Sequence, residues 1–218
     1  MAHTANRGDL RRPEIRVLEP AVTRGLADRL RLTRLLARFP ERPVWALFMF
    51  VNGFVTIALL AILAWLTHTP FVFPSLGPTA FLFFFTPTSP TASPRHTLFG
   101  HAIGILCGWG ALLLTGLEHA PPALTIGVDF DRVLAAALSL ASTGALMILC
   151  KAAHPPAGAT TLIVSLGVVT KPRYLLLIEG AVALLTLQAI VINRLAGIDY
   201  PLWAWRTPRP TLRPPAPP

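Results

Sequence analysis

Charged residues are scarce over most of this chain. They make up 13% of the 218 residues, and 53% are hydrophobic, whereas about a quarter of an average soluble domain is charged. The charge is also unevenly placed, because ten of the nineteen basic residues, all arginine, and five of the ten acidic ones precede Pro43. The remainder is nearly free of charge, which excludes an ordinary soluble domain and indicates an integral membrane protein.

Cysteine and clustered metal ligands are also scarce. Cys107 and Cys150 each lie within an apolar run, where a free thiol behaves as a small hydrophobe. We therefore expect no disulfide framework, no metal and no cofactor. The sequence lacks a nucleophile elbow and a phosphate-binding glycine loop, so we expect no catalytic residues and no enzyme; Ser139 or Ser142 with His154 is the one conceivable nucleophile and base. The arginines do not alternate with stacking aromatics, so we expect no nucleic-acid partner.

Long apolar runs dominate what is present. Four of them, 44–66, 98–117, 133–150 and 174–193, reach the roughly 17 to 25 residues that a helix needs to cross a bilayer. Two shorter runs, 71–86 and 155–169, begin with prolines and glycines. The pattern predicts an all-α, polytopic membrane helix bundle of four long helices and two short helices broken by proline and glycine.

The flanks suggest three parts. Residues 1–42 form an arginine-rich tail, in which leucines recur between arginines over 21–39. This spacing predicts an amphipathic helix on anionic lipid headgroups, or alternatively a solvated charged helix. Residues 43–206 form the transmembrane domain, and the proline-rich residues 207–218 are predicted to be disordered.

Arginine excess near both ends predicts that both termini are cytoplasmic. The acidic central loop, 118–131, is then outside, which requires three crossings before it and six in all. Lys171 and Arg173 would lie outside against the rule, so four spans with two re-entrant segments remain the alternative. We expect a bacterial inner (cytoplasmic) membrane.

The two halves resemble each other. FPSLGPTAFLF aligns with HPPAGATTLIV, and the paired prolines, glycines and threonines share one offset of 81 residues. Pro94–Arg95 aligns with Pro172–Arg173 at an offset of 78. Each half reads as a long span, a break, a short helix, a Pro-Arg turn and a second long span. We interpret 44–117 and 132–195 as internal repeats, and three crossings in each would make them inverted.

Paired breaks in membrane helices predict a binding site. Irregular backbone survives at membrane depth only inside protein or around a wet cavity, and a helix N-terminus attracts anions. The predicted substrate-binding residues are Ser75, Gly77, Thr79, His154, Gly158, Thr160 and Thr161. The alternative is that the prolines and glycines only let helices kink and pack closely.

Two ionisable residues lie deep within apolar runs. His101 and Glu179 occupy equivalent places in the repeats, so we predict that they pair and couple transport to H⁺; alternatively, each hydrates near an interface. His154 is predicted either to meet the anion or to cap the preceding helix.

Three further polar residues have simpler alternatives. Arg95 and Arg173 are candidates for recruiting an anion at the two mouths of a pathway, or else they anchor span ends at the interface. Asn52 in the first long run is expected to bridge two helices.

The segments PSLGPTAFLFFFTPTSPTASPRHTLFGHAIG and KAAHPPAGATTLIV resemble the two signatures of the HPP integral-membrane family, named for the motif His154-Pro155-Pro156. The resemblance runs from about Pro43 to Trp205. It implies four transmembrane helices and, because plant chloroplast and cyanobacterial relatives are associated with nitrite transport, a transporter or channel for a small inorganic anion such as nitrite. A non-transporting membrane scaffold or sensor is the alternative. Homo-oligomer formation is left open.

Overall fold

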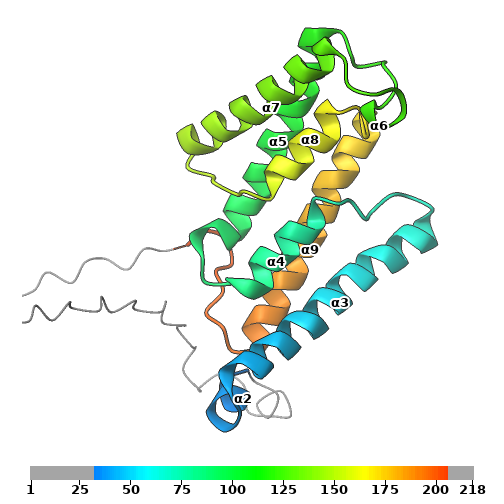
Figure 1. Cartoon of the computed structure of the whole chain (residues 1–218). Helices are drawn as coiled ribbons and strands as arrows, with labels where there is room; N and C mark the ends of the chain where they lie inside the picture. Colours follow the sequence, from blue (N-terminus) through cyan, green and yellow to red (C-terminus); the bar gives the residue numbers. More distant parts are fainter. Residues whose placement is uncertain (1–31, 206–218) are drawn as a thin grey trace, which may run out of the picture.

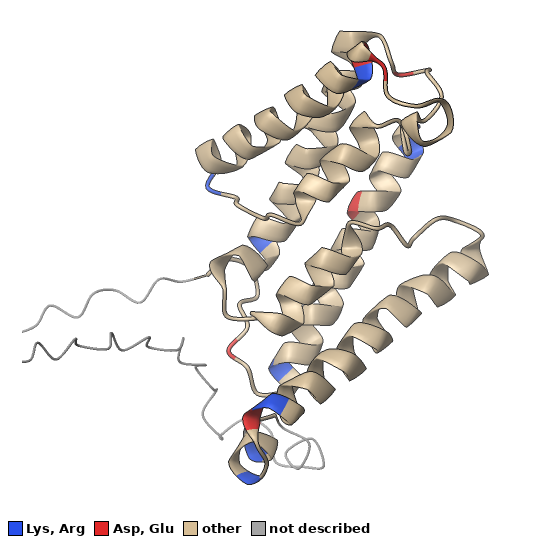
Figure 2. Cartoon of the chain, in the orientation of Figure 1, with Lys and Arg blue, Asp and Glu red and all other residues tan. Residues whose placement is uncertain are grey.

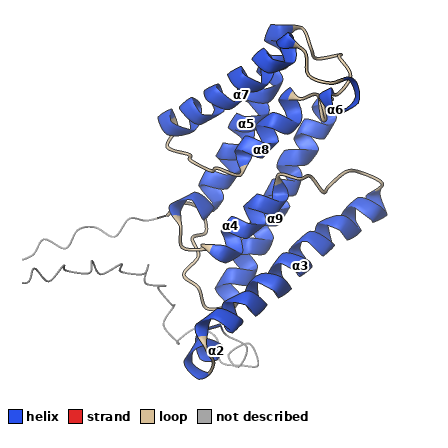
Figure 3. Cartoon of the chain, viewed as in Figure 1, coloured by secondary structure: helices blue, strands red, loops and turns tan. Residues whose placement is uncertain are grey.

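The computed structural model describes residues 32–205. Figure 3 shows helices joined by loops throughout, and no β-strand is present between these residues. This confirms the prediction of an all-α chain. Residues 1–31 and 206–218 lie outside the described range, so most of the predicted amphipathic segment and the proline-rich tail stay predictions.

The helices follow one another with short connections. Their bounds are α2 Leu32–Arg38, α3 Glu41–Thr67, α4 Leu76–Phe85, the 3₁₀ turn η1 Pro90–Ala92, α5 Pro94–Thr115, α6 Ala123–Ile126, α7 Phe130–Leu149, α8 Ala157–Ser165 and α9 Pro172–Leu195. Helices α3, α5, α7 and α9 are long and apolar enough to cross a membrane, which confirms the four predicted spans. With 10 and 9 residues, α4 and α8 are each only about 15 Å long.

All four long helices begin two to four residues earlier than the apolar pattern predicts, and two of them begin at a proline. Pro94 and Pro172 occupy the first positions of α5 and α9, where the fixed φ of proline suits a helix start and its missing N–H costs nothing. The Pro-Arg pairs therefore lie in the first turns of these helices, and the expectation of separate Pro-Arg turns was wrong.

The four long and two short helices pack as two groups, which can be followed in Figure 1. In one group α8 packs against α5 and α7, and in the other α4 packs against α3 and α9. Contacts between α5 and α9 join the groups. Each short helix is thus held by two long ones, one from each half of the sequence.

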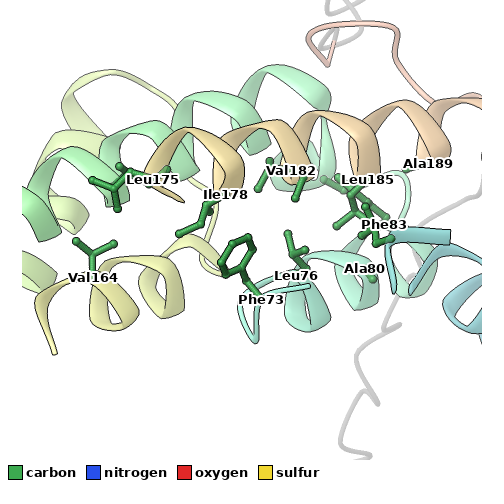
Figure 4. Close-up of a cluster of buried hydrophobic side chains, with 14 of the residues drawn as sticks. Phe73, Leu76, Ala80, Phe83, Val164, Leu175, Ile178, Val182, Leu185 and Ala189 are labelled. Atoms are coloured by element: carbon green, nitrogen blue, oxygen red, sulfur yellow. The ribbon is translucent and has the colours of Figure 1, made fainter. Parts of the chain in front are cut away.

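Large apolar side chains fill the space between α9 and α4. Ile178, Val182 and Leu185 of α9 are fully buried, and Figure 4 shows them facing Phe73 and Leu76 across this layer. This core keeps the two helix backbones apart by the width of their side chains.

The packing of α8 on α5 is much closer. Glycines recur every fourth residue along one face of α5, at Gly100, Gly104 and Gly108. A Cβ added at Gly104 would lie 2.8 Å from Oγ1 of Thr161 and 2.9 Å from the carbonyl oxygen of Ala157. The backbone of α8 therefore rests directly on α5, as small-xxx-small faces permit in membrane helices.

The outer surface of the long helices is apolar. Phe50, Phe54 and Trp65 of α3 are 71%, 68% and 73% exposed, which in water would be a costly surface but is the surface that lipid requires. Figure 2 shows that most charged residues lie at helix ends, with an acidic residue in the middle part of α9. The chain is a multi-pass membrane protein.

Candidate functional site

The first turns of the two short helices converge on one histidine of α5. Thr79 is the fourth residue of α4, and Thr160 is the fourth residue of α8. Oγ1 of Thr79 lies 2.9 Å from Nε2 of His101, and Oγ1 of Thr160 lies 2.7 Å from Nδ1 of the same ring. All three side chains are fully buried. The sequence named each of these residues, and the structure brings them together.

The hydrogen-bond partners indicate which atoms of His101 donate. Thr79 donates its only hydroxyl hydrogen to the carbonyl of Ser75, at 3.1 Å, so it is free to accept from Nε2–H of His101. A neutral imidazole then has a lone pair at Nδ1, which accepts from the hydroxyl of Thr160. A neutral His101 is thus held between two hydroxyl groups, donating to Thr79 and accepting from Thr160.

His154 lies beside His101, with the ring centroids 5.0 Å apart. Its Nδ1 lies 2.8 Å from the carbonyl oxygen of Thr91, and its Nε2 lies 3.4 Å from Oγ1 of Thr79. Neither ring nitrogen binds the end of α7, so the prediction that His154 caps the preceding helix was wrong. The ring turns instead toward the loop before α5 and toward the site.

Arg95 caps α7 in place of His154. Its guanidinium donates to the carbonyl oxygens of Lys151 and Cys150, at 2.6 and 3.1 Å, where the helix dipole is negative. Arg173 donates to the hydroxyl of Tyr174 at 2.9 Å and stacks over its ring. Both arginines thus have intramolecular partners at helix ends, which is the arrangement of the anchoring alternative.

The predicted pair of His101 and Glu179 does not form. Both ring nitrogens of His101 are taken by threonines, and no hydrogen bond joins it to Glu179 among the residues described. The cause is the orientation of α9, which buries Ile178 and Val182 in the core and leaves Glu179 to one side. One carboxylate oxygen of Glu179 is buried without a hydrogen-bond partner.

The remaining predicted site residues differ in how freely they could meet a ligand. The Oγ of Ser75, at the start of α4, is fully buried and lacks a hydrogen-bond partner. A Cβ at Gly77 would meet no atom within 4 Å, and one at Gly158 would meet only Cδ1 of Leu140, at 3.5 Å. The hydroxyl of Thr161 already has partners within the protein. It donates to Gly104 O at 3.1 Å and contacts the hydroxyl of Thr143.

The expectation that Asn52 bridges two helices was wrong. Asn52 donates to the carbonyl of Phe48 in its own helix, at 2.7 Å, and so does not bridge helices through this bond. Ser139 and Ser142 likewise donate to carbonyls of α7. Neither serine is hydrogen-bonded to His154 within the described chain, so this nucleophile and base pair is not assembled.

A buried arginine, Arg132, was not among the predicted site residues. Arg132, in the first turn of α7, is 1% exposed and donates to the carbonyls of Ser165 and Pro121, each at 3.0 Å. It ties the end of α8 to the start of α7. An arginine directly before a predicted span was the available signal, and the G-x-x-x-G spacing in α5 was the corresponding signal for the glycine face.

Tyr200 fixes the loop that holds His154. Its hydroxyl donates to the carbonyl of Ala92, the residue after Thr91. Burial raises the pKa of the Tyr200 hydroxyl above its ordinary value, so the group stays protonated and remains a donor. The carbonyl that binds His154 is thereby held in place from the C-terminal side.

An apolar groove of about 630 Å³ runs beside the site. It is lined by Pro78, Phe81 and Phe85 of α4 and by Pro155 and Pro156, which precede α8. Pro78 and Pro155 are adjacent in sequence to Thr79 and His154, so the groove lies against the two first turns.

These features define a polytopic helical membrane protein whose two short helices meet at a buried polar centre. The chain belongs to the family described as HPP, transmembrane region, which matches residues 40–201. Two proteins of Dictyostelium discoideum, each named only as a transmembrane protein, are similar: one is 31% identical over 60% of this chain and 44% of its own length, the other 30% identical over 71% and 50%. The chain thus spans about half the length of these relatives. No solved structure matches it.

Proposed function

We propose that this protein is a membrane transporter or channel for a small inorganic anion, with nitrite as the first candidate. The observation that carries the proposal is the meeting of Thr79 and Thr160 at His101. Each threonine lies in the first turn of a short helix, so two positive helix ends are aimed at one buried polar centre.

The first turn of α4 has free capacity for an anion. Ser75 Oγ is buried without a partner, and an unsatisfied buried hydroxyl normally costs free energy. Two residues further on, no other group in the described chain covers the backbone at Gly77, since even a Cβ there would meet nothing within 4 Å. Backbone N–H groups and a hydroxyl at a helix N-terminus are the donors that bind anions elsewhere.

The donors around His101 are neutral, which favours an anion of low charge. The nearby Arg95 already donates its N–H groups to carbonyl oxygens. Hydroxyls, imidazoles and helix ends would bind a monovalent anion weakly enough for release, as conduction requires. The family resemblance puts nitrite first among such anions.

Equivalent positions support the inverted-repeat interpretation. Gly77 and Gly158 are both second in their short helices, and Arg95 and Arg173 are both second in α5 and α9. Inverted-repeat transporters place substrate where such discontinuous helices meet. On this proposal the chain crosses six times, with both termini in the cytoplasm of a bacterium and the protein in its inner membrane.

Nitrite flux into proteoliposomes of the purified chain tests the proposal. We expect uptake above that of protein-free vesicles, and we expect Gly77→Val to remove it while the protein stays folded, because the branched side chain has room but would cover the backbone donors. Gly144→Val is the matched control, since Gly144 on α7 also has nothing within 4 Å. Wild-type protein without uptake would favour the scaffold or sensor alternative.

A further inference from the structure

The two histidines of the site are not equivalent as hydrogen-bonding groups. Each nitrogen of His101 has a hydroxyl within 3 Å, whereas His154 has a short contact at Nδ1 only. That contact is to a backbone carbonyl, which can only accept. The hydrogen of a neutral His154 must therefore be on Nδ1, and its Nε2 must carry a lone pair.

No hydrogen-bond donor of the described residues points at the lone pair on Nε2 of His154. The hydroxyl nearest to Nε2 is Thr79, at 3.4 Å, and its hydrogen is directed at the carbonyl of Ser75. Thr97, which lies 3.4 Å from the other ring nitrogen, donates to Ser93 O in the same way. His154 is nevertheless fully buried, so its Nε2 is a basic atom enclosed in the site with little to satisfy it.

The surroundings disfavour a lone positive charge at His154. His101 and His96 of α5 face it, and Arg95 binds the carbonyl of Lys151 in the loop that precedes it. No carboxylate is hydrogen-bonded to His154 in the described part of the chain. A buried charge without a partner is costly, but an anion beside the ring would supply the missing counter-charge.

We infer that His154 takes up a proton at Nε2 when the anion binds, so that H⁺ and the anion cross together without net charge. The inference rests on the proposed function and names the co-substrate of that same site. An N–H bond forms at Nε2 with a proton from water on the entry side, while Nδ1–H stays on the Thr91 carbonyl. On the far side the proton returns to water as the anion leaves.

By linkage, an anion that raises proton affinity is itself bound more tightly when the proton is present. His101 has a supporting part. With both nitrogens satisfied by Thr79 and Thr160, it stays neutral and links the two short helices, and so it is a positioning residue. The proton carrier is then His154 and not the earlier candidates His101 and Glu179.

Proteoliposomes with an entrapped pH dye and a clamped membrane potential test the inference. Inward nitrite gradients should acidify the lumen beyond protein-free vesicles, at a rate independent of the potential. His154→Asn keeps a donor near the Thr91 carbonyl but removes Nε2, so it should abolish the acidification. His96→Gln, which removes a neighbouring imidazole, should retain it.

The outcomes separate the two proposals. Nitrite uptake without acidification, at a rate that follows the potential, overturns the coupling alone, and so does undiminished acidification in His154→Asn. Absence of uptake in the wild type overturns the proposed function and the coupling with it.

A measurement on wild-type protein covers the case in which His154→Asn does not fold. Solubilised protein should take up protons from weak buffer when nitrite is added, and ¹⁵N spectra should show the Nδ1–H form of His154 without nitrite. An Nε2–H form in the nitrite-free protein would contradict the inference.

Discussion

Thr79 and Thr160, which are 81 residues apart in the sequence, bind opposite nitrogens of one imidazole ring. The contacts measure 2.9 and 2.7 Å. The ring thereby joins α4 to α8 at their first turns. Because the three groups belong to three different helices, a change at one is expected to affect the relative position of the other two.

Removing either hydroxyl should lower both stability and transport. Thr79→Val or Thr160→Val leaves one nitrogen of His101 unsatisfied, which costs about 1–3 kcal/mol in a buried site, and a loss of this size in binding corresponds to roughly a tenfold to hundredfold fall in nitrite flux. Thr186→Val is the control, since Thr186 is buried but donates only to its own helix. Equal flux in all three variants would show that the contacts to His101 are not needed.

Because α8 packs closely on the glycine face of α5, we expect larger residues on that face to lower the stability of the protein. Gly104→Ala places a Cβ within 3 Å of Thr161 Oγ1 and of the Ala157 carbonyl, and such overpacking costs about 1–3 kcal/mol. We expect a lower melting temperature in detergent. Gly110→Ala, in the same helix but with nothing within 4 Å, should melt at or above the wild-type temperature. A wild-type melting temperature for Gly104→Ala would mean that α8 can move away from α5 at little cost.

Loss of Arg132 should lower the stability of the protein more than loss of Arg173. Arg132→Gln removes two hydrogen bonds from a charged donor to Ser165 O and Pro121 O, and each such bond is worth about 1.5–3 kcal/mol. Arg173→Gln, at an exposed position, is the matched control. Thermal unfolding should separate the two variants clearly, and similar melting temperatures would contradict a structural role for Arg132.

Topology can be tested with single cysteines in a chain lacking Cys107 and Cys150. Six crossings place Ser89 inside and the loop after α5 outside. Ala123 is buried and would label poorly, so the exposed His119 is the better position in that loop. Ser89→Cys and His119→Cys should react from opposite sides. Reaction from the same side would favour two re-entrant segments.

The sequence predicts the helices well because their causes are local. Apolar runs long enough for a bilayer yielded all four long helices, and proline and glycine marked the two short ones. The short helices begin at Leu76 and Ala157, five and two residues after the start of their apolar runs, because the prolines before them hold the chain in turns.

The site was predictable only in part. The repeat pointed to Thr79, Thr160 and His101, since equivalent positions suggest a common centre. It also suggested His101 and Glu179 as a pair, which was wrong because the rotation of α9 about its axis depends on core packing that the alignment does not contain. The partner of His154, the carbonyl of Thr91, is a backbone group, and no side-chain pattern could have indicated it.

The unequal packing of the two short helices divides the molecule into a stiff part and a softer part. Where α8 meets α5 at Gly104 and Gly108, the backbones pack so closely that no space is left even for a Cβ on α5. Where α4 meets α9, side chains such as Phe73 and Leu76 intervene and can change rotamer. Any motion that opens the centre at His101 to one side of the bilayer would therefore move α3 and α4. Helices α5, α7 and α8 would keep their relative positions.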